Sequence, residues 1–270
     1  MTSPSRRFAE LSVAQVRSRC SADSVAVLPV GAVEQHGPHL PLITDALVAE
    51  AASTAAVDRH GEELDLWLLP TLTYGRSVEH EWAPGTLSLS TSTFAAVLAD
   101  LGRGVAATGI RRLVLVNGHG GNSSEIQTML RDLRRAHGLL TFAVNAFPPP
   151  EEDPFADVER GQGIHGGAGE TSLLLHLRPD LVDMDAAAPR LPRGLADNTH
   201  VRFGGTVGFG WLSDDFGPDG YLGDPTRASA DTGRKAFAAM TAQLGEQLAE
   251  IARFDFTHHL ATHHRTVPVL

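Results

Sequence analysis

The sequence predicts an α/β protein, a three-layer α/β/α sandwich with a mostly parallel central sheet. Two observations support this class: short apolar runs rich in Val and Leu recur along the chain, and segments of helical period follow them. The length of 270 residues fits one large domain of this kind. Because no linker divides the chain, we expect a single domain over residues 1–270.

Four segments are expected to form the strands. Residues 24–30 are an apolar run that ends at Gly31, and residues 64–70, 112–117 and 140–145 have the same character. Runs of this length and composition are typical of strands that are buried on both faces of a parallel sheet.

Four helices are expected between and after these strands, at residues 45–59, 91–109, 123–137 and 232–253. Thr91 or Ser92 is the expected cap of the second. Alternation of such helices with strands produces βα units, and the helices then cover both faces of the sheet. In such sheets the loops that follow the carboxyl ends of the strands hold ligands.

Two segments lack a regular pattern. Residues 147–167 are rich in Pro, Gly and acidic residues, and we expect a long functional loop or an oligomer contact there. Within this segment, residues 153–159 are expected to form a solvated acidic surface. Residues 190–227 are rich in Gly and Asp and show little periodicity.

Composition excludes several classes of function. The 22 basic and 32 acidic residues give a formal net charge of −10, which disfavours nucleic acid as a partner. No apolar stretch is long enough for a membrane span and the first ten residues do not form a secretory signal, so we expect no membrane partner and a cytoplasmic location. The one cysteine, Cys20, rules out a Cys-x-x-Cys zinc pair, so a metal site must use His and carboxylates.

The loop after the first strand carries the first candidate ligands. Glu34 and His36 are two residues apart, so in an extended segment their side chains point to the same side, which suits a shared metal site. Asp45 begins a predicted helix. Its carboxylate could bridge two cations, and capping of the helix is the alternative.

Two further candidate groups follow later in the chain. His119 lies in a Gly-rich turn directly after the strand at 112–117, and the glycines allow a ligand to approach the backbone. His165 and Glu170 share another Gly-rich loop. The three candidate groups all lie at strand ends or in loops, so we expect the fold to bring them together.

These segments resemble the creatininase (creatinine amidohydrolase) family in order and spacing. The matching segments are residues 27–45, which include Glu-Gln-His-Gly-Pro-His, 74–80, 84–89, 117–122 (Asn-Gly-His-Gly-Gly-Asn) and 165–172. The resemblance covers most of the chain from about Val27 to Asp185, and it returns at residues 223–226.

The resemblance implies a fold, a reaction and a set of ligands. The fold would be a three-layer sandwich, and the reaction hydrolysis of an amide-type C–N bond by a hydroxide bound to two cations of Zn²⁺, Mn²⁺ or Fe²⁺. Glu34 and His119 would hold one cation, His36 the other, and Asp45 would bridge them. His165 would be the catalytic group that transfers protons, and the chain would assemble as a homohexamer.

The chain departs from creatininase proper at two places. A Tyr-Glu pair of that enzyme is replaced by Gly120 and Gly121, which removes a glutamate ligand of the second cation. We expect Glu170 to supply the missing carboxylate as a ligand and catalytic residue, and capping of the following helix is the alternative. A substrate-stacking tryptophan is replaced by Gly161, so creatinine is not the expected substrate.

Several other polar residues have two interpretations. His80 and Asn122 are expected in the substrate pocket, with a structural role in its loop as the alternative for His80. His39 is expected to orient a metal ligand. The four histidines between residues 257 and 264 resemble a metal site by composition, but a terminal tail or a subunit contact is favoured there.

Three functions are consistent with these features. The first is an amidohydrolase acting on a cyclic amide, a formamide or a modified peptide. The second is a creatininase-like peptidase of redox-cofactor maturation, of the mycofactocin type, because that branch also has the Gly-Gly turn. The third is a non-catalytic binding or structural protein on the same scaffold, supported only by the missing glutamate.

Overall fold

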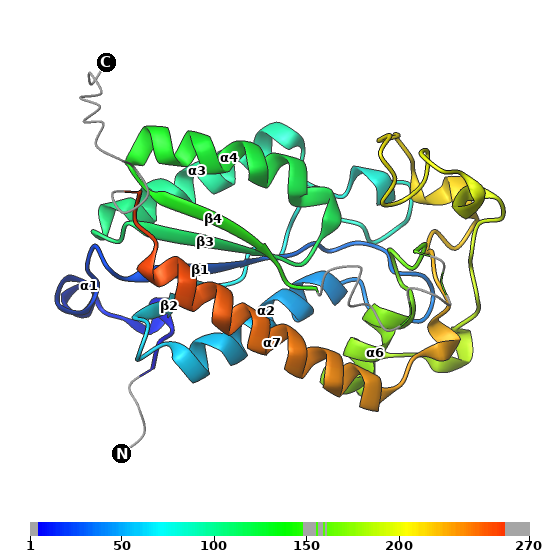
Figure 1. Cartoon of the computed structure of the whole chain (residues 1–270), viewed down its shortest axis with the longest axis horizontal. Coiled ribbons are helices and arrows are strands. Elements are labelled where there is room, and N and C mark those ends of the chain that lie inside the picture. The colour runs from blue at the N-terminus through cyan, green and yellow to red at the C-terminus, as the bar shows by residue number, and fades with distance from the viewer. Residues whose placement is uncertain (1–4, 148–154, 156–158, 160, 257–270) are drawn as a thin grey trace.

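The computed structural model describes residues 5–147, 155, 159 and 161–256. Four strands form one sheet in the order β2-β1-β3-β4, and each neighbouring pair is parallel (Figure 1). The strands are β1 (Val25–Val30), β2 (Leu66–Leu68), β3 (Arg112–Asn117) and β4 (Leu140–Asn145). The parallel sheet expected from the sequence is therefore confirmed.

Helices cover both faces of the sheet. One face packs against α2 (Thr44–His60), α6 (Ala168–Leu177) and α7 (Ala230–Arg253). The other face packs against α3 (Thr91–Ala107) and α4 (Ser123–His137) (Figure 1). The arrangement is the predicted three-layer α/β/α sandwich.

The side chains of each strand alternate between two apolar cores. In β1, Val25 and Val27 belong to the core beneath α2 and α7, whereas Ala26 and Leu28 belong to the core beneath α3 and α4. This alternation follows from the two-residue period of a strand. Every residue of β1 is buried, as a strand covered on both faces requires.

Most predicted boundaries agree with the structure, with a few differences. The strand expected at residues 64–70 extends only over β2, and α1 (Val13–Arg19) was not expected from the sequence. The cap of α3 is Ser90, whose Oγ accepts a hydrogen bond from the Thr93 amide at 3.2 Å, so the expectation of Thr91 or Ser92 was wrong by one or two positions. Ser229 caps α7 in the same way, so that helix begins at Ala230, two residues before its expected start.

Short 3₁₀ helices occur in the connecting segments. Their bounds are Phe8–Glu10, Val78–His80, Gly120–Asn122, Pro179–Leu181, Met184–Ala186, Leu195–Asp197, Ser213–Phe216 and Pro225–Arg227. Three of them lie in the segment 190–227, whose other residues form only isolated β-bridges at Arg190, Leu222 and Gly223, in agreement with its weak periodicity.

The carboxyl ends of the parallel strands lie at one edge of the sheet, so the loops that follow them are neighbours. The loop after β1 runs directly against the first turn of α2. A Cβ atom at Gly31 would collide with the backbone of Ala46, and glycine therefore allows this close approach. This contact brings the residues that follow β1 close to Asp45.

The expected acidic surface at residues 153–159 was wrong for Glu159, which is 1% exposed. Its Oε1 accepts hydrogen bonds from the main-chain amides of Ala168, at 3.0 Å, and Asp224, at 2.5 Å. Ala168 begins α6, where the free amides of a helix amino terminus favour a carboxylate. The other acidic residue positions of that stretch, Asp153 and Asp157, lie outside the described residues.

Two other predictions fall wholly or partly outside the part of the chain that the structure describes. The C-terminal histidine cluster at residues 257–264 lies beyond it, as does most of the loop between residues 148 and 160. Within the described residues, no helix combines the length and the apolar character needed to cross a membrane.

Candidate metal centre

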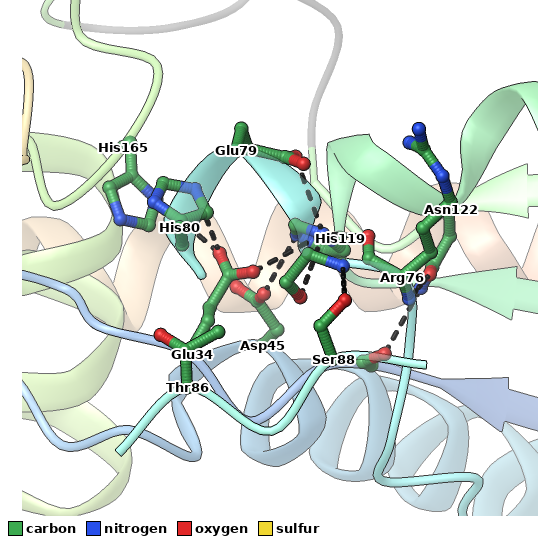
Figure 2. A network of polar contacts seen from close by, with 12 residues as sticks. Glu34, Asp45, Arg76, Glu79, His80, Thr86, Ser88, His119, Asn122 and His165 are labelled. Carbon is green, nitrogen blue, oxygen red and sulfur yellow. Dashed lines mark hydrogen bonds and ion pairs between the residues drawn. The ribbon is translucent and has the colours of Figure 1, made fainter. Parts of the chain in front are cut away.

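Six loop or helix-end positions converge on one buried cluster of carboxylates and imidazoles, part of which is drawn in Figure 2. The loop after β1 supplies Glu34 and His36, the first turn of α2 supplies Asp45, and the turn after β3 supplies His119. His165 precedes α6, and Glu170 lies in its first turn. All but Glu170 are buried as whole residues, and the side chain of Glu170 is 16% exposed.

The first group of possible ligands comprises Glu34, Asp45 and His119. His119 Nε2 lies 3.2 Å from Glu34 Oε2, and His119 Nδ1 lies 3.1 Å from Asp45 Oδ2. The main-chain carbonyl of Arg76 is 2.9 Å from His119 Nε2 and can only accept a hydrogen bond. In the neutral ring, Nε2 therefore carries the proton and Nδ1 offers its lone pair on the side of Asp45.

The second group comprises His36, Asp45 and Glu170. His36 Nε2 lies 3.1 Å from Asp45 Oδ1 and 3.9 Å from Glu170 Oε2. His36 Nδ1 lies 3.2 Å from the main-chain carbonyl of Glu34, to which the neutral ring donates, so Nε2 is available to a ligand. Asp45 thus presents one carboxylate oxygen to each group.

Asp45 does not cap α2. The residue at the cap position is Ile43, and Asp45 lies in the first turn with its side chain directed at His36 and His119. Glu170 does not cap α6, because the residue at the cap position is Gly167, and its role as a ligand stays a prediction. Its Oε2 accepts a hydrogen bond from the Gly166 amide at 2.6 Å, just before α6, and the same oxygen faces His36.

A third group comprises Glu34, His36 and His165. His165 Nδ1 lies 3.6 Å from Glu34 Oε1, and His36 Nε2 lies 3.9 Å from the same oxygen. His80 Nε2 approaches this oxygen at 3.5 Å, and its ring stacks on that of His165 with centroids 4.0 Å apart. In Figure 2, His80 and His165 face one side of Glu34 and His119 faces the other.

The buried carboxylates suit cations. Glu34 Oε1, Glu34 Oε2 and Asp45 Oδ2 are buried, and no well-formed hydrogen bond from the described residues satisfies them. Imidazole nitrogens are their close polar neighbours, at 3.2 Å from Glu34 Oε2 and 3.1 Å from Asp45 Oδ2. Burial of charged carboxylates is costly, and a divalent cation with oxygen and imidazole ligands removes that cost. The residues present therefore fit a divalent metal.

The pKa values show how the cluster balances its charge without metal. Burial opposes protonation of His36, but the carboxylates of Asp45, Glu170 and Glu34 outweigh it and raise the pKa of His36 to about 10. Burial likewise opposes protonation of His119, yet Glu34 and Asp45 hold its pKa well above the usual range. Burial raises the pKa of Glu170 to about 7. In the metal-free protein, protonated imidazoles thus balance the carboxylate charge that bound cations would otherwise neutralise.

His80 and His165 behave in the opposite way. Burial lowers the pKa of His80 to about 3, with the charges on His36 and His119 acting in the same direction. Burial, followed by the charge on His36, holds the pKa of His165 well below its ordinary value. Both rings are therefore neutral near pH 7, so each retains one nitrogen that can accept a proton.

Asn122 joins three loop segments behind the cluster. Its Oδ1 accepts a hydrogen bond from the Arg76 amide at 2.8 Å, and its Nδ2 donates to the Gly31 carbonyl at 3.0 Å and to Asn117 Oδ1 at 3.3 Å. These contacts show a bracing role, and a contact between Asn122 and substrate stays a prediction.

His39 contacts the loop of His165 and Glu170 and no candidate ligand directly. Its Nε2 lies 2.9 Å from the Gly166 carbonyl and 3.2 Å from Thr171 Oγ1. The ring therefore holds the backbone on which two candidate residues are placed.

Three polar residues around the cluster were missed in the sequence. Gln35 Nε2 lies 2.8 Å from His80 Nδ1, and the buried Ser213 Oγ lies 3.0 Å from the same nitrogen. Glu79 Oε1 lies 3.7 Å from His119 Nε2, beside Gly121, where a Cβ atom would collide with it. Gln35 could have been found because it lies between Glu34 and His36, whereas Ser213 belongs to a segment without a pattern.

The chain is similar to known proteins over most of its length. The family described as "Creatininase: Creatinine amidohydrolase" matches residues 9–248. A "Mycofactocin precursor peptide peptidase" of Mycobacterium tuberculosis (strain CDC 1551 / Oshkosh) is 40% identical over 222 residues, covering 79% of this chain and 80% of the relative. A "Creatinine amidohydrolase" of Pseudomonas putida is 37% identical over 202 residues, covering 68% of this chain and 76% of the relative.

A solved structure described as "Creatininase Mn" superposes with a TM-score of 0.73 at 29% sequence identity, covering 93% of this chain and 100% of that one. The similarity thus extends over the sheet, the helices and the loops that carry the cluster. The chain belongs to the creatininase family of amidohydrolases.

Proposed function

We propose that this protein is a two-cation amidohydrolase that cleaves an amide-type C–N bond in a modified peptide. The observation that supports it most strongly is the position of Asp45, whose two carboxylate oxygens lie 3.1 Å from His36 Nε2 and 3.1 Å from His119 Nδ1. A carboxylate between two ligand groups is the arrangement that a pair of divalent cations requires.

The proposed roles of the residues follow from the geometry. Glu34, Asp45 and His119 would hold one cation, and His36, Asp45 and Glu170 the other. When bound, the two cations supply an activated water and polarise the amide carbonyl. Zn²⁺, Mn²⁺ and Fe²⁺ all suit such ligands.

His165 is proposed to carry the proton to the departing nitrogen. Its Nε2 lies 2.6 Å from the main-chain carbonyl of Gln35, and a carbonyl can only accept, so Nε2 carries the ring proton. Nδ1 then faces Glu34 with a free lone pair, where it can take a proton and pass it on. His80 stacks on this ring and is proposed to border the substrate.

The substrate class rests on two observations. The relatives named as mycofactocin precursor peptide peptidases are 37–40% identical over about four fifths of this chain. Position 161 is also a glycine with space around its Cβ position, so no side chain there would stack on a small ring such as creatinine. Both favour a peptide over creatinine.

A direct assay tests this function. Metal-loaded protein is incubated separately with a modified mycofactocin-type precursor peptide, a panel of lactams and formamides, and creatinine, and products are followed by mass spectrometry. We expect cleavage of the modified peptide and none of creatinine. Hydrolysis of the lactams or formamides alone would refute the peptide class but keep the amidohydrolase, whereas no hydrolysis with full metal occupancy would refute catalysis.

Assembly and location are also proposals, the first from the family resemblance and the second from the sequence. We propose a homohexamer in the cytoplasm, built from one domain per chain. Sedimentation velocity on the metal-loaded protein tests the hexamer, and a species of one or two chains would contradict it.

A further inference from the structure

We propose that the second cation has two alternative positions, and that Zn²⁺ prefers the one in which His165 is a ligand. This inference rests on the proposed two-cation function. One position is the group of His36, Asp45 and Glu170, and the other is the group of Glu34, His36 and His165. We call them the carboxylate position and the imidazole position.

The imidazole position is built around one unsatisfied oxygen. Glu34 Oε1 is fully buried and accepts no hydrogen bond. His165 Nδ1 lies 3.6 Å and His36 Nε2 3.9 Å from it, which is too long for hydrogen bonds. Ligand atoms at ~2.0–2.1 Å from a tetrahedral zinc are roughly 3.4 Å from one another, so small movements would complete such a shell.

Both imidazoles offer the correct nitrogen. The second nitrogen of each ring lies within hydrogen-bond distance of a main-chain carbonyl. His165 Nε2 lies 2.6 Å from the carbonyl of Gln35, and His36 Nδ1 lies 3.2 Å from the carbonyl of Glu34. A carbonyl that accepts from one ring nitrogen leaves the lone pair of the other free, as it does behind most histidine ligands of metals. The two free nitrogens therefore face the same carboxylate oxygen.

The two positions differ in ligand chemistry and exclude each other. The imidazole position offers two imidazoles and one carboxylate, a set that suits Zn²⁺. The carboxylate position offers one imidazole and two carboxylates, and a larger share of oxygen ligands suits Mn²⁺. Because both need His36 Nε2, a single chain cannot fill both positions at once.

The choice of position determines whether His165 can transfer protons. A cation in the imidazole position occupies Nδ1 of His165, the atom proposed to carry the proton. A cation in the carboxylate position leaves that atom free. Excess Zn²⁺ should therefore inhibit the Mn²⁺-loaded enzyme by moving the second cation onto His165.

Binding measurements test the proposal without a substrate. The affinities of the second Zn²⁺ and the second Mn²⁺ are measured by equilibrium dialysis on the metal-free full chain, for wild type, His165→Ala and Glu170→Gln. We expect His165→Ala to weaken the second Zn²⁺ by at least about tenfold, as loss of a ligand should, while the second Mn²⁺ changes by less than about twofold. Glu170→Gln should show the reverse pattern.

His80→Ala is the matched control. Its ring stacks on His165 at 4.0 Å, and its Nε2 lies 3.5 Å from Glu34 Oε1. His80 Nδ1 accepts a hydrogen bond from the Gln35 side-chain amide at 2.8 Å, so the Nε2 of the neutral ring carries the proton and is no ligand. His80 belongs to none of the three ligand groups, so neither affinity should change by more than about twofold. The melting temperature of each metal-free variant establishes that it folds, and His165→Gln replaces His165→Ala if the latter does not.

The outcomes separate this inference from the proposed function. If two cations bind and His165→Ala leaves the Zn²⁺ affinity unchanged, the inference is overturned while the two-cation function stands. If wild type binds only one cation of either metal, the proposed function fails and the inference fails with it.

Discussion

The ring of His165 is fixed by the main-chain carbonyl of Gln35, which lies 2.6 Å from its Nε2. Gln35 is the residue between Glu34 and His36, so the segment that supplies two candidate ligands also orients the proposed proton carrier. The amide of the Gln35 side chain contacts His80 and the Gly220 carbonyl as well. One short loop therefore positions two imidazoles that come from distant parts of the chain, His80 and His165.

Replacement of His165 should separate catalysis from Mn²⁺ binding. In the Mn²⁺-loaded enzyme, His165→Ala removes only the proton carrier, so kcat should fall by roughly 10²–10⁴ while two cations remain bound. Steady-state kinetics on the peptide substrate and elemental analysis of the same sample check this. Retention of most of the wild-type kcat would show that another group protonates the leaving nitrogen.

The metal-free protein should lose stability as the pH rises from about 6.5 to about 10. The pKa of His36 rises from 6.5 to about 10 on folding, so in this range the folded state holds a proton that the unfolded state has released. Rising pH then favours unfolding. Melting temperatures across this range should fall for the metal-free protein and stay nearly constant for the Mn²⁺-loaded protein. An equal fall in melting temperature for both forms would show that the proton on His36 does not stabilise the metal-free protein.

His119→Ala should empty one cation position. His119 belongs to the group with Glu34 and Asp45, and it is absent from the other two groups. Elemental analysis after dialysis should therefore find about one cation per chain in place of two. A variant that still holds two tightly bound cations would show that the turn after β3 supplies no ligand.

Glu159→Ala should destabilise the fold. Removal of this buried carboxylate leaves the amides of Ala168 and Asp224 without their acceptor, at a cost of about 2 kcal/mol in the free energy of unfolding. The exposed Glu62 provides a control, because Glu62→Ala should change stability by less than about 0.5 kcal/mol. The unfolding of both variants is measured in urea. Equal urea midpoints for the two variants would refute the bracing role of Glu159.

Much of the fold follows from local patterns. The strands β1 and β3 are predicted because strands buried on both faces are continuous apolar runs, and Val25–Val30 is such a run. β4 has the same apolar character, but it lies at the edge of the sheet and its residues are half-buried or exposed. The helix α1 was missed because it is one short segment of seven residues without a buried residue. The start of α7 differs from the expected one by two residues because Ser229 caps the helix, and in α3 the cap is Ser90 although the helix begins at Thr91 as expected.

The site is predictable only in part. Glu34 and His36 stand out by their spacing after a strand, Asp45 by its place at the start of a helix, and His119 by its Gly-rich turn after another strand. The parallel sheet brings these positions together. Glu159 and Ser213 lie in segments without a regular pattern, and both are buried. The sequence pattern of such a segment does not indicate which of its residues pack against the core, so Glu159 was predicted to lie on the surface.

The most direct test of the central claim is the number of divalent cations bound by wild type and by Asp45→Ala. Asp45 is the residue shared by the two proposed ligand groups, and without it two cations would repel each other across a site that has lost a bridging charge. Elemental analysis after dialysis against Mn²⁺ and removal of free metal should find about two cations per chain in wild type and fewer than about 0.2 in Asp45→Ala. Two cations retained in Asp45→Ala, or none in wild type, would contradict the two-cation centre.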